Sequence, residues 1–88
     1  MRREIDDYLQ YLKEEKNASP HTVSNYRRDL EQFLNHQGDG DPREVKPLDI
    51  RAFLVSLSER ECSKSTVSRK LSALRSLFRY LLRQKRVD

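Results

Sequence analysis

The chain has 88 residues, which is enough for one small domain and too few for two. Charged residues make up 36% of it, and no apolar run approaches the length that a membrane span requires. The first residues lack the features of a signal peptide, and Cys62, the only cysteine, cannot form an internal disulfide, so we expect a soluble protein of the reducing cytoplasm.

Charge is distributed unevenly along the chain, whose formal net charge is +4. Residues 1–62 are mildly acidic, whereas residues 63–87 contain no acid at all. The basic residues of that segment are Lys64, Arg69, Lys70, Arg75, Arg79, Arg83, Lys85 and Arg86. A basic helix is often only a solvated face, but such a face usually mixes charges to gain i,i+4 pairs. The absence of acids therefore favours attraction of a polyanion.

Apolar residues at helical spacing predict two helices in the first half of the chain. The first covers residues 3–16 and buries Ile5, Tyr8, Leu9 and Leu12. The second begins with Ser19 as a cap and Pro20 at the first helical position, where a missing N–H costs nothing. Its apolar stripe consists of Val23, Tyr26, Leu30, Phe33 and Leu34. The glycine-containing segment 37–42 ends it and forms a loop.

Two further helices are predicted in the second half. The third begins near Pro47, with Asp49 favourably placed in its first turn but with Lys46, which offers no acceptor, at the cap. Its expected core contacts are Leu48, Phe53, Leu54 and Leu57, with Ile50 at the margin. The fourth covers residues 65–83, and its apolar side consists of Val67, Leu71, Leu74, Leu77, Phe78, Leu81 and Leu82. The fold class is therefore all-α, a compact four-helix domain.

The fourth predicted helix carries short polar and basic side chains opposite its apolar side. They are Ser65, Ser68, Arg69, Ser72, Arg75, Ser76, Arg79 and Arg83. Serines let a helix backbone approach a groove closely, and arginines offer planar pairs of donors to phosphates or guanine. Serine is only a middling helix former, so four on one face suggest a role beyond helix stability. We expect Thr66 and Lys70 on a neighbouring flank, still able to contact a duplex.

The start of the second predicted helix repeats this pattern more weakly. Its polar side chains are His21, Thr22, Ser24, Asn25 and Arg28. Free N–H groups and the positive end of the dipole make a helix start suitable for phosphate. An ordinary capped helix start would look much the same.

Catalytic and metal-binding patterns are not found in the sequence. His21 and His36 have no partner at metal-ligand spacing, and Cys62 has no evident base. No glycine-rich phosphate loop is present. The tyrosines at 8, 11, 26 and 80 are best interpreted as packing residues. We expect no catalytic residue, metal or cofactor in this chain.

Three motifs together resemble the N-terminal core-binding domain of phage-integrase-type tyrosine recombinases. They are SPHTVSNYRRDL at 19–30, LDIRAFL at 48–54 and STVSRKLSALRSLFRYL at 65–81. The last contains the RKLSALR run that is frequent in the final helix of this domain. The resemblance follows nearly the whole chain in order and is closest to the Xer recombinases.

The resemblance implies a SAM-like fold with orthogonal helix pairs, in which the second and fourth helices face the major groove of duplex DNA. Residues 1–84 would form the DNA-binding domain, and residues 85–88 would begin the linker to an absent catalytic domain that completes a clamp on the recombination half-site. The implied DNA contacts are Thr22, Ser24, Asn25, Arg28, Lys64, Ser65, Thr66, Arg69, Lys70, Ser72, Arg75 and Arg79. The family also implies a tetramer on DNA, a monomeric isolated domain and, for Xer enzymes, resolution of chromosome dimers.

Other interpretations of the sequence stay open. The domain could be a SAM-like interaction module whose basic face binds an acidic protein, or it could come from the integrase of a phage or mobile element. A stand-alone transcription factor is disfavoured, because the loop after Leu57 is longer than the tight turn of a helix-turn-helix.

Overall fold

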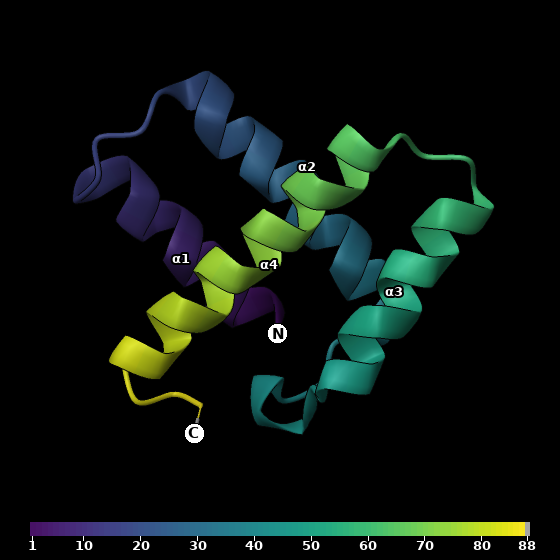
Figure 1. The fold of residues 1–88 in the computed structure, drawn as a ribbon. Helices are drawn as coiled ribbons and strands as arrows, with labels where there is room; N and C mark the ends of the chain where they lie inside the picture. Colours follow the sequence, from purple (N-terminus) through teal and green to yellow (C-terminus); the bar gives the residue numbers. More distant parts are fainter. Residues whose placement is uncertain (88) are drawn as a thin grey trace.

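The computed structural model describes residues 1–87 as four α-helices and one short 3₁₀ turn, with no strand in that range (Figure 1). The helices are α1 (Arg2–Glu14), α2 (Pro20–Gln37), α3 (Pro47–Glu59) and α4 (Lys64–Arg83), and the 3₁₀ turn covers Pro42–Glu44. The all-α prediction is confirmed. No helix of residues 1–87 has both the length and the apolar character needed to cross a bilayer.

The helix starts follow the capping chemistry of the sequence. Ser19 Oγ accepts the backbone N–H of Thr22 at 3.1 Å, as expected for a cap before Pro20. Ser63 Oγ accepts the N–H of Thr66 at 3.1 Å in the same way, so α4 starts one residue earlier than predicted. At α3 the predicted start at Pro47 is confirmed.

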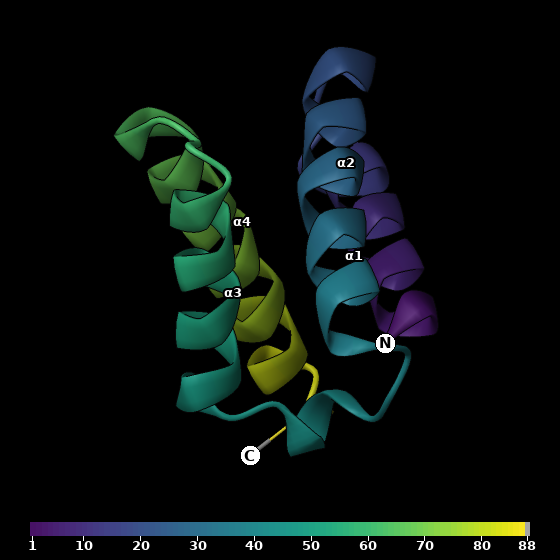
Figure 2. The ribbon, with the colours of Figure 1, turned by 90° about the vertical axis from the view of Figure 1, so that its right-hand side faces the viewer.

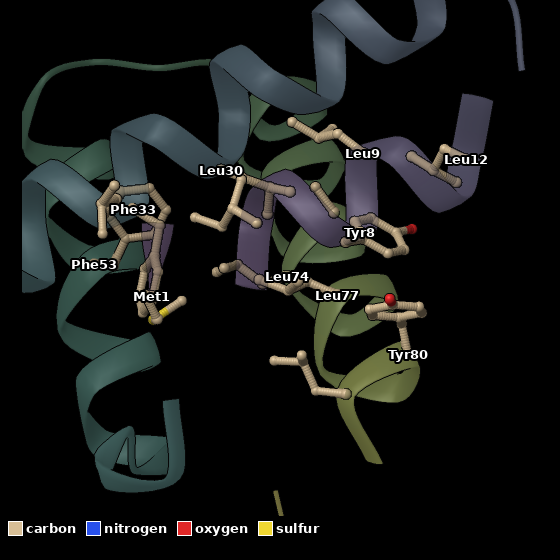
Figure 3. Close-up of a cluster of buried hydrophobic side chains, with 14 of the residues drawn as sticks. Met1, Tyr8, Leu9, Leu12, Leu30, Phe33, Phe53, Leu74, Leu77 and Tyr80 are labelled. Atoms are coloured by element: carbon tan, nitrogen blue, oxygen red, sulfur yellow. The ribbon is translucent and has the colours of Figure 1, made fainter. Parts of the chain in front are cut away.

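The helices form two layers, with α1 beside α2 and α3 beside α4 (Figure 2). Helix α4 crosses in front of α2 in Figure 1, so residues about 40 positions apart meet at the crossing. The core lies between the layers (Figure 3), and its most deeply buried side chains include Leu30, Phe33, Leu77 and Leu81. The Phe33 and Phe53 rings meet edge to face with centroids 5.3 Å apart, which ties α2 to α3.

The four tyrosines, predicted to be packing residues, pack on one another. The ring centroid of Tyr8 lies 6.1 Å from that of Tyr26 and 5.3 Å from that of Tyr80. The ring centroids of Tyr11 and Tyr80 are 4.9 Å apart. Burial raises the pKa of the Tyr8 phenol above its ordinary value. This cluster joins α1, α2 and α4.

Two leucines predicted to be in the core are exposed. Leu48 is 70% exposed, because the buried stripe of α3 runs through Ile50, Phe53 and Leu57, and a residue two positions before Ile50 lies on another side. Leu82 is 55% exposed because its neighbour Leu81 occupies the buried position of that turn.

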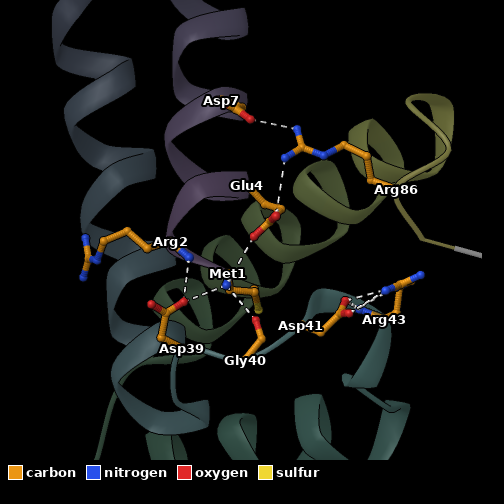
Figure 4. A network of polar contacts seen from close by, with 9 residues as sticks. All are labelled: Met1, Arg2, Glu4, Asp7, Asp39, Gly40, Asp41, Arg43 and Arg86. Carbon is orange, nitrogen blue, oxygen red and sulfur yellow. Dashed lines mark hydrogen bonds and ion pairs between the residues drawn. The ribbon is translucent and has the colours of Figure 1, made fainter.

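The amino group of Met1 ties α1 to the loop after α2 (Figure 4). It donates to Asp39 Oδ1 at 2.7 Å and to the Gly40 carbonyl at 2.6 Å, and it lies 3.2 Å from Glu4 Oε1. Burial alone would lower the pKa of this amine, but its hydrogen bonds to Asp39 and Glu4 outweigh burial and raise the pKa above 8.0.

The segment after α4 folds back onto α1. Arg86 Nη1 lies 2.9 Å from Asp7 Oδ2, and Arg86 Nη2 lies 3.4 Å from Glu4 Oε2 (Figure 4). Val87 packs against the core. Of the linker predicted at 85–88, Asp88 lies outside the described residues.

Candidate nucleic-acid interface

The outer face of α4 carries exposed hydroxyls and guanidiniums, as predicted for most of its members. The exposed residues of this face are Ser65, Ser68, Arg69, Ser72, Arg75, Arg79 and Arg83. The prediction is wrong for Ser76, which is half-buried on the side of α4 that packs on Tyr8. The face is therefore narrower than the sequence suggested.

The first turns of α2 and α4 both lack acidic residues, whereas those of α1 and α3 contain Glu4 and Asp49. In Figure 2 both acid-free starts lie at the upper end of the molecule. In each, the capping serine hydroxyl also donates to a threonine hydroxyl at 3.0 Å, Ser19 to Thr22 and Ser63 to Thr66. Two positive dipole ends at one end of the fold can both attract phosphate.

A cleft of about 170 Å³ separates the facing sides of α2 and α4. Its lining residues are Thr22, Asn25, Tyr26, Asp29, Arg69 and Ala73. It therefore brings together three of the residues predicted to bind DNA: Thr22, Asn25 and Arg69. Ser24 instead lines a cavity with Lys13 of α1, and Arg79 lines one near Pro42.

The carboxylate of Asp29 joins α2 to α4 beside this cleft. Its side chain is 4% exposed and accepts from two cations. Arg69 donates Nε to Oδ2 and Nη2 to Oδ1, both at 3.1 Å, and Lys70 Nζ lies 2.7 Å from Oδ1. A carboxylate this deeply buried requires such partners, because an unpaired buried charge is costly.

Lys70 does not lie where we expected it. Its side chain is 5% exposed, so the prediction of an accessible flank is wrong. The physical reason is spacing: Ala73, Leu74 and Leu77 follow it by three, four and seven residues, which places all four on the buried side of α4. Arg69 is held by the same carboxylate, yet its side chain stays 56% exposed.

Asp29 was missed as a candidate site residue. Asp29 lies three residues after Tyr26 and four before Phe33, which places it on the apolar side of α2. This spacing is the feature of the sequence that could have identified it. An acid at such a position indicates a buried ion pair, but the sequence does not identify the partner helix.

The remaining predicted contacts are accessible. Lys64 and Arg28 are exposed, and Asn25 and Thr66 are partly so. No ion pair joins Arg28, Lys64, Arg75 or Arg79 to an acid within residues 1–87. Other arginines are paired: Arg27 contacts Asp6 and Glu31, and Arg43 lowers the pKa of Asp41 to about 2. The unpaired cations of α2 and α4 can neutralise phosphates.

Metal ligation and thiol chemistry gain no support from the described residues. Within residues 1–87, no group of three His, Cys, Asp or Glu side chains could hold a metal ion. Cys62 is a half-buried free thiol, and both histidines are exposed.

Residues 5–85 match the family model described as phage integrase, N-terminal SAM-like domain. The chain is 48% identical over 87 residues to a protein of Oceanobacillus iheyensis named tyrosine recombinase XerC. The matched region covers 96% of this chain and 28% of the relative. It is 45% identical to the protein of that name from Natranaerobius thermophilus, with 99% of this chain and 30% of the relative covered. The chain thus spans less than a third of the length of these relatives. No solved structure matches it closely enough to be counted as similar.

Proposed function

The chain belongs to the phage integrase N-terminal SAM-like domain family, and from this premise we propose that it binds duplex DNA as the N-terminal part of a Xer-type tyrosine recombinase. The observation that carries the proposal is the acid-free pair of helix starts beside the exposed serine and arginine face of α4. Short hydroxyl side chains allow close approach to a groove, and unpaired cations neutralise its phosphates.

Helices α2 and α4 are the elements proposed to meet the major groove. The proposed contacts are Thr22, Ser24, Asn25, Arg28, Lys64, Ser65, Thr66, Arg69, Ser72, Arg75 and Arg79. Lys70 is left out because its ammonium is buried against Asp29. Arg75 and Arg79 are proposed to hold phosphates, since neither is tied to an acid.

The whole protein is proposed to act in the cytoplasm as a site-specific recombinase that resolves chromosome dimers, because its relatives are named XerC. The catalytic residues would lie in a second domain beyond this chain, and subunits would assemble as a tetramer on the recombination site. On its own the module is proposed to be a monomer without strand-cleavage activity. Its binding alone would be weak, because a clamp gains much of its affinity from two linked sites.

Salt dependence tests the binding proposal. If about five phosphates are neutralised, the logarithm of the association constant falls with the logarithm of salt concentration with a slope of about −4.5. Fluorescence anisotropy with a labelled random-sequence duplex of about 30 base pairs would then show a loss of two to three orders of magnitude between about 50 and 200 mM salt.

A charge-matched pair of variants locates the interface. Arg75→Ala should weaken binding and reduce the slope by about one, because one phosphate contact is lost. Arg3→Ala removes the same charge from the start of α1, away from the starts of α2 and α4, and should change binding little. If both variants weakened DNA binding equally, the proposal that the exposed face of α4 contacts DNA would be contradicted. Absence of duplex binding, together with binding to an acidic protein, would favour the interaction-module alternative.

A further inference from the structure

The guanidinium of Arg69 binds Asp29 through its Nε–Nη2 edge, and within residues 1–87 no hydrogen bond is made by its Nη1. Its Nε and Nη2 both donate to the Asp29 carboxylate at 3.1 Å. A guanidinium has five N–H donors in a rigid plane, so this pairing leaves the two donors of Nη1 and the second donor of Nη2. The side chain is 56% exposed and lines the cleft between α2 and α4.

Lys70 fixes the carboxylate independently of Arg69. Its Nζ lies 2.7 Å from Asp29 Oδ1, and both side chains are about 95% buried. Lys70 also balances the charge of Asp29 inside the fold, so Arg69 keeps its positive charge for a ligand. The carboxylate is therefore a fixed support rather than a mobile surface partner.

We propose that Asp29 is a positioning residue that orients the free edge of Arg69 for two-bond recognition of a guanine in the major groove; this rests on the proposed function. Guanine O6 and N7 form a planar pair of acceptors that matches the Nη1–Nη2 edge. Orientation matters for such a planar pair and much less for a phosphate, which unpaired cations such as Arg75 can neutralise from many directions. A support that fixes the plane of Arg69 thus serves base recognition.

Charge alone predicts a different result when Asp29 is changed. Removing a carboxylate raises the net charge and should strengthen binding to any duplex. The double substitution Asp29→Asn with Lys70→Met leaves the net charge unchanged and leaves no unpaired buried ammonium. A loss of DNA affinity in this double variant therefore cannot be caused by a change in net charge.

The test is selection from a randomised duplex library by the 88-residue chain, followed by affinity measurements on the selected duplex. Arg69→Ala should abolish preference for guanine at one position. The Asp29→Asn/Lys70→Met variant should weaken binding to the selected duplex about three- to tenfold, because an unsupported side chain must be ordered on binding. It should also lose part of the preference for guanine at that same position. Lys70→Met alone, which keeps the Asp29–Arg69 pair, should retain the preference.

A double-mutant cycle separates positioning from a merely structural role. In the Arg69→Ala background the Asp29→Asn/Lys70→Met change should have no further effect on affinity. An equal loss in both backgrounds, or no loss in either, overturns the proposal.

A second measurement needs no change at Asp29. Replacing the selected guanine by 7-deazaguanine removes the N7 acceptor, which should weaken binding by the wild-type chain and leave binding by Arg69→Ala unaffected. If the wild-type chain binds duplex DNA but shows no preference for guanine that depends on Arg69, this inference is overturned and the proposed function stands. No duplex binding by the wild-type chain would instead refute the proposed function.

Discussion

Replacing Asp29 by alanine should destabilise the domain far more than replacing Lys70 by methionine. Asp29 has two cationic partners and Lys70 has one, and both side chains of the 2.7 Å pair are about 95% buried. Asp29→Ala leaves the Lys70 ammonium buried without a partner, which costs about 3 kcal/mol. In Lys70→Met the carboxylate keeps Arg69 and the methionine fills the space of the lysine stem, so we expect a change within about 1 kcal/mol.

Urea unfolding followed by circular dichroism measures this asymmetry. With a slope of about 1 kcal/mol per M, typical of a small domain, Asp29→Ala should lower the midpoint by about 3 M. The Asp29→Ala/Lys70→Met double variant should recover most of that loss, because it removes the unpaired charge. The reasoning is refuted if Asp29→Ala costs less than Lys70→Met, or if the double variant is as unstable as the sum of the two single variants.

Three further outcomes are expected, each measured by urea unfolding. The hydrogen bonds that raise the pKa of the Met1 amine contribute stability that is present below pH 8.0 and lost as the pH rises through the raised pKa, so the urea midpoint should be level below pH 8.0 and fall above it, and fall less in Asp39→Asn. Phe53→Ala should cost about 3–5 kcal/mol, whereas Leu48→Ala should stay within about 0.5 kcal/mol, because Phe53 is 3% exposed and Leu48 70%. Ser63→Ala should cost about 1 kcal/mol through loss of the α4 cap.

Local chemistry made the helix starts predictable. Ser19 and Pro20 determine where α2 begins, and Pro47 does the same for α3, because each acts on the backbone within a few residues. Lys46 offers no side-chain acceptor at the start of α3, but Asp49 in the first turn compensates, because its Oδ2 accepts the Lys46 N–H at 2.8 Å. Such interactions need no knowledge of the tertiary fold.

The site was less predictable because it depends on the crossing of α2 and α4. Periodicity could have placed Lys70 on the buried side of α4 and Asp29 on the apolar side of α2. It could not pair them, since the two lie 41 positions apart in the sequence and only the packing of the layers brings Lys70 Nζ to 2.7 Å from Asp29 Oδ1. The exposed part of the site, including Ser65 and Arg75, followed from the helical repeat alone.

The charge count of the last segment overstates the charge that a ligand can meet. Lys70 balances the charge of Asp29, and Arg86 pairs with Glu4 and Asp7. The cations of α4 that a ligand can still meet include Arg69, which is fixed by a carboxylate, and the exposed side chains of Lys64, Arg75 and Arg79, which pair with no acid within residues 1–87. A small patch of this kind gives modest affinity by itself, and linkage to a second DNA-binding domain would raise its effective concentration at the duplex. Under the proposed function, the unpaired cations would supply affinity for phosphates, and the Asp29–Arg69 pair would add orientation.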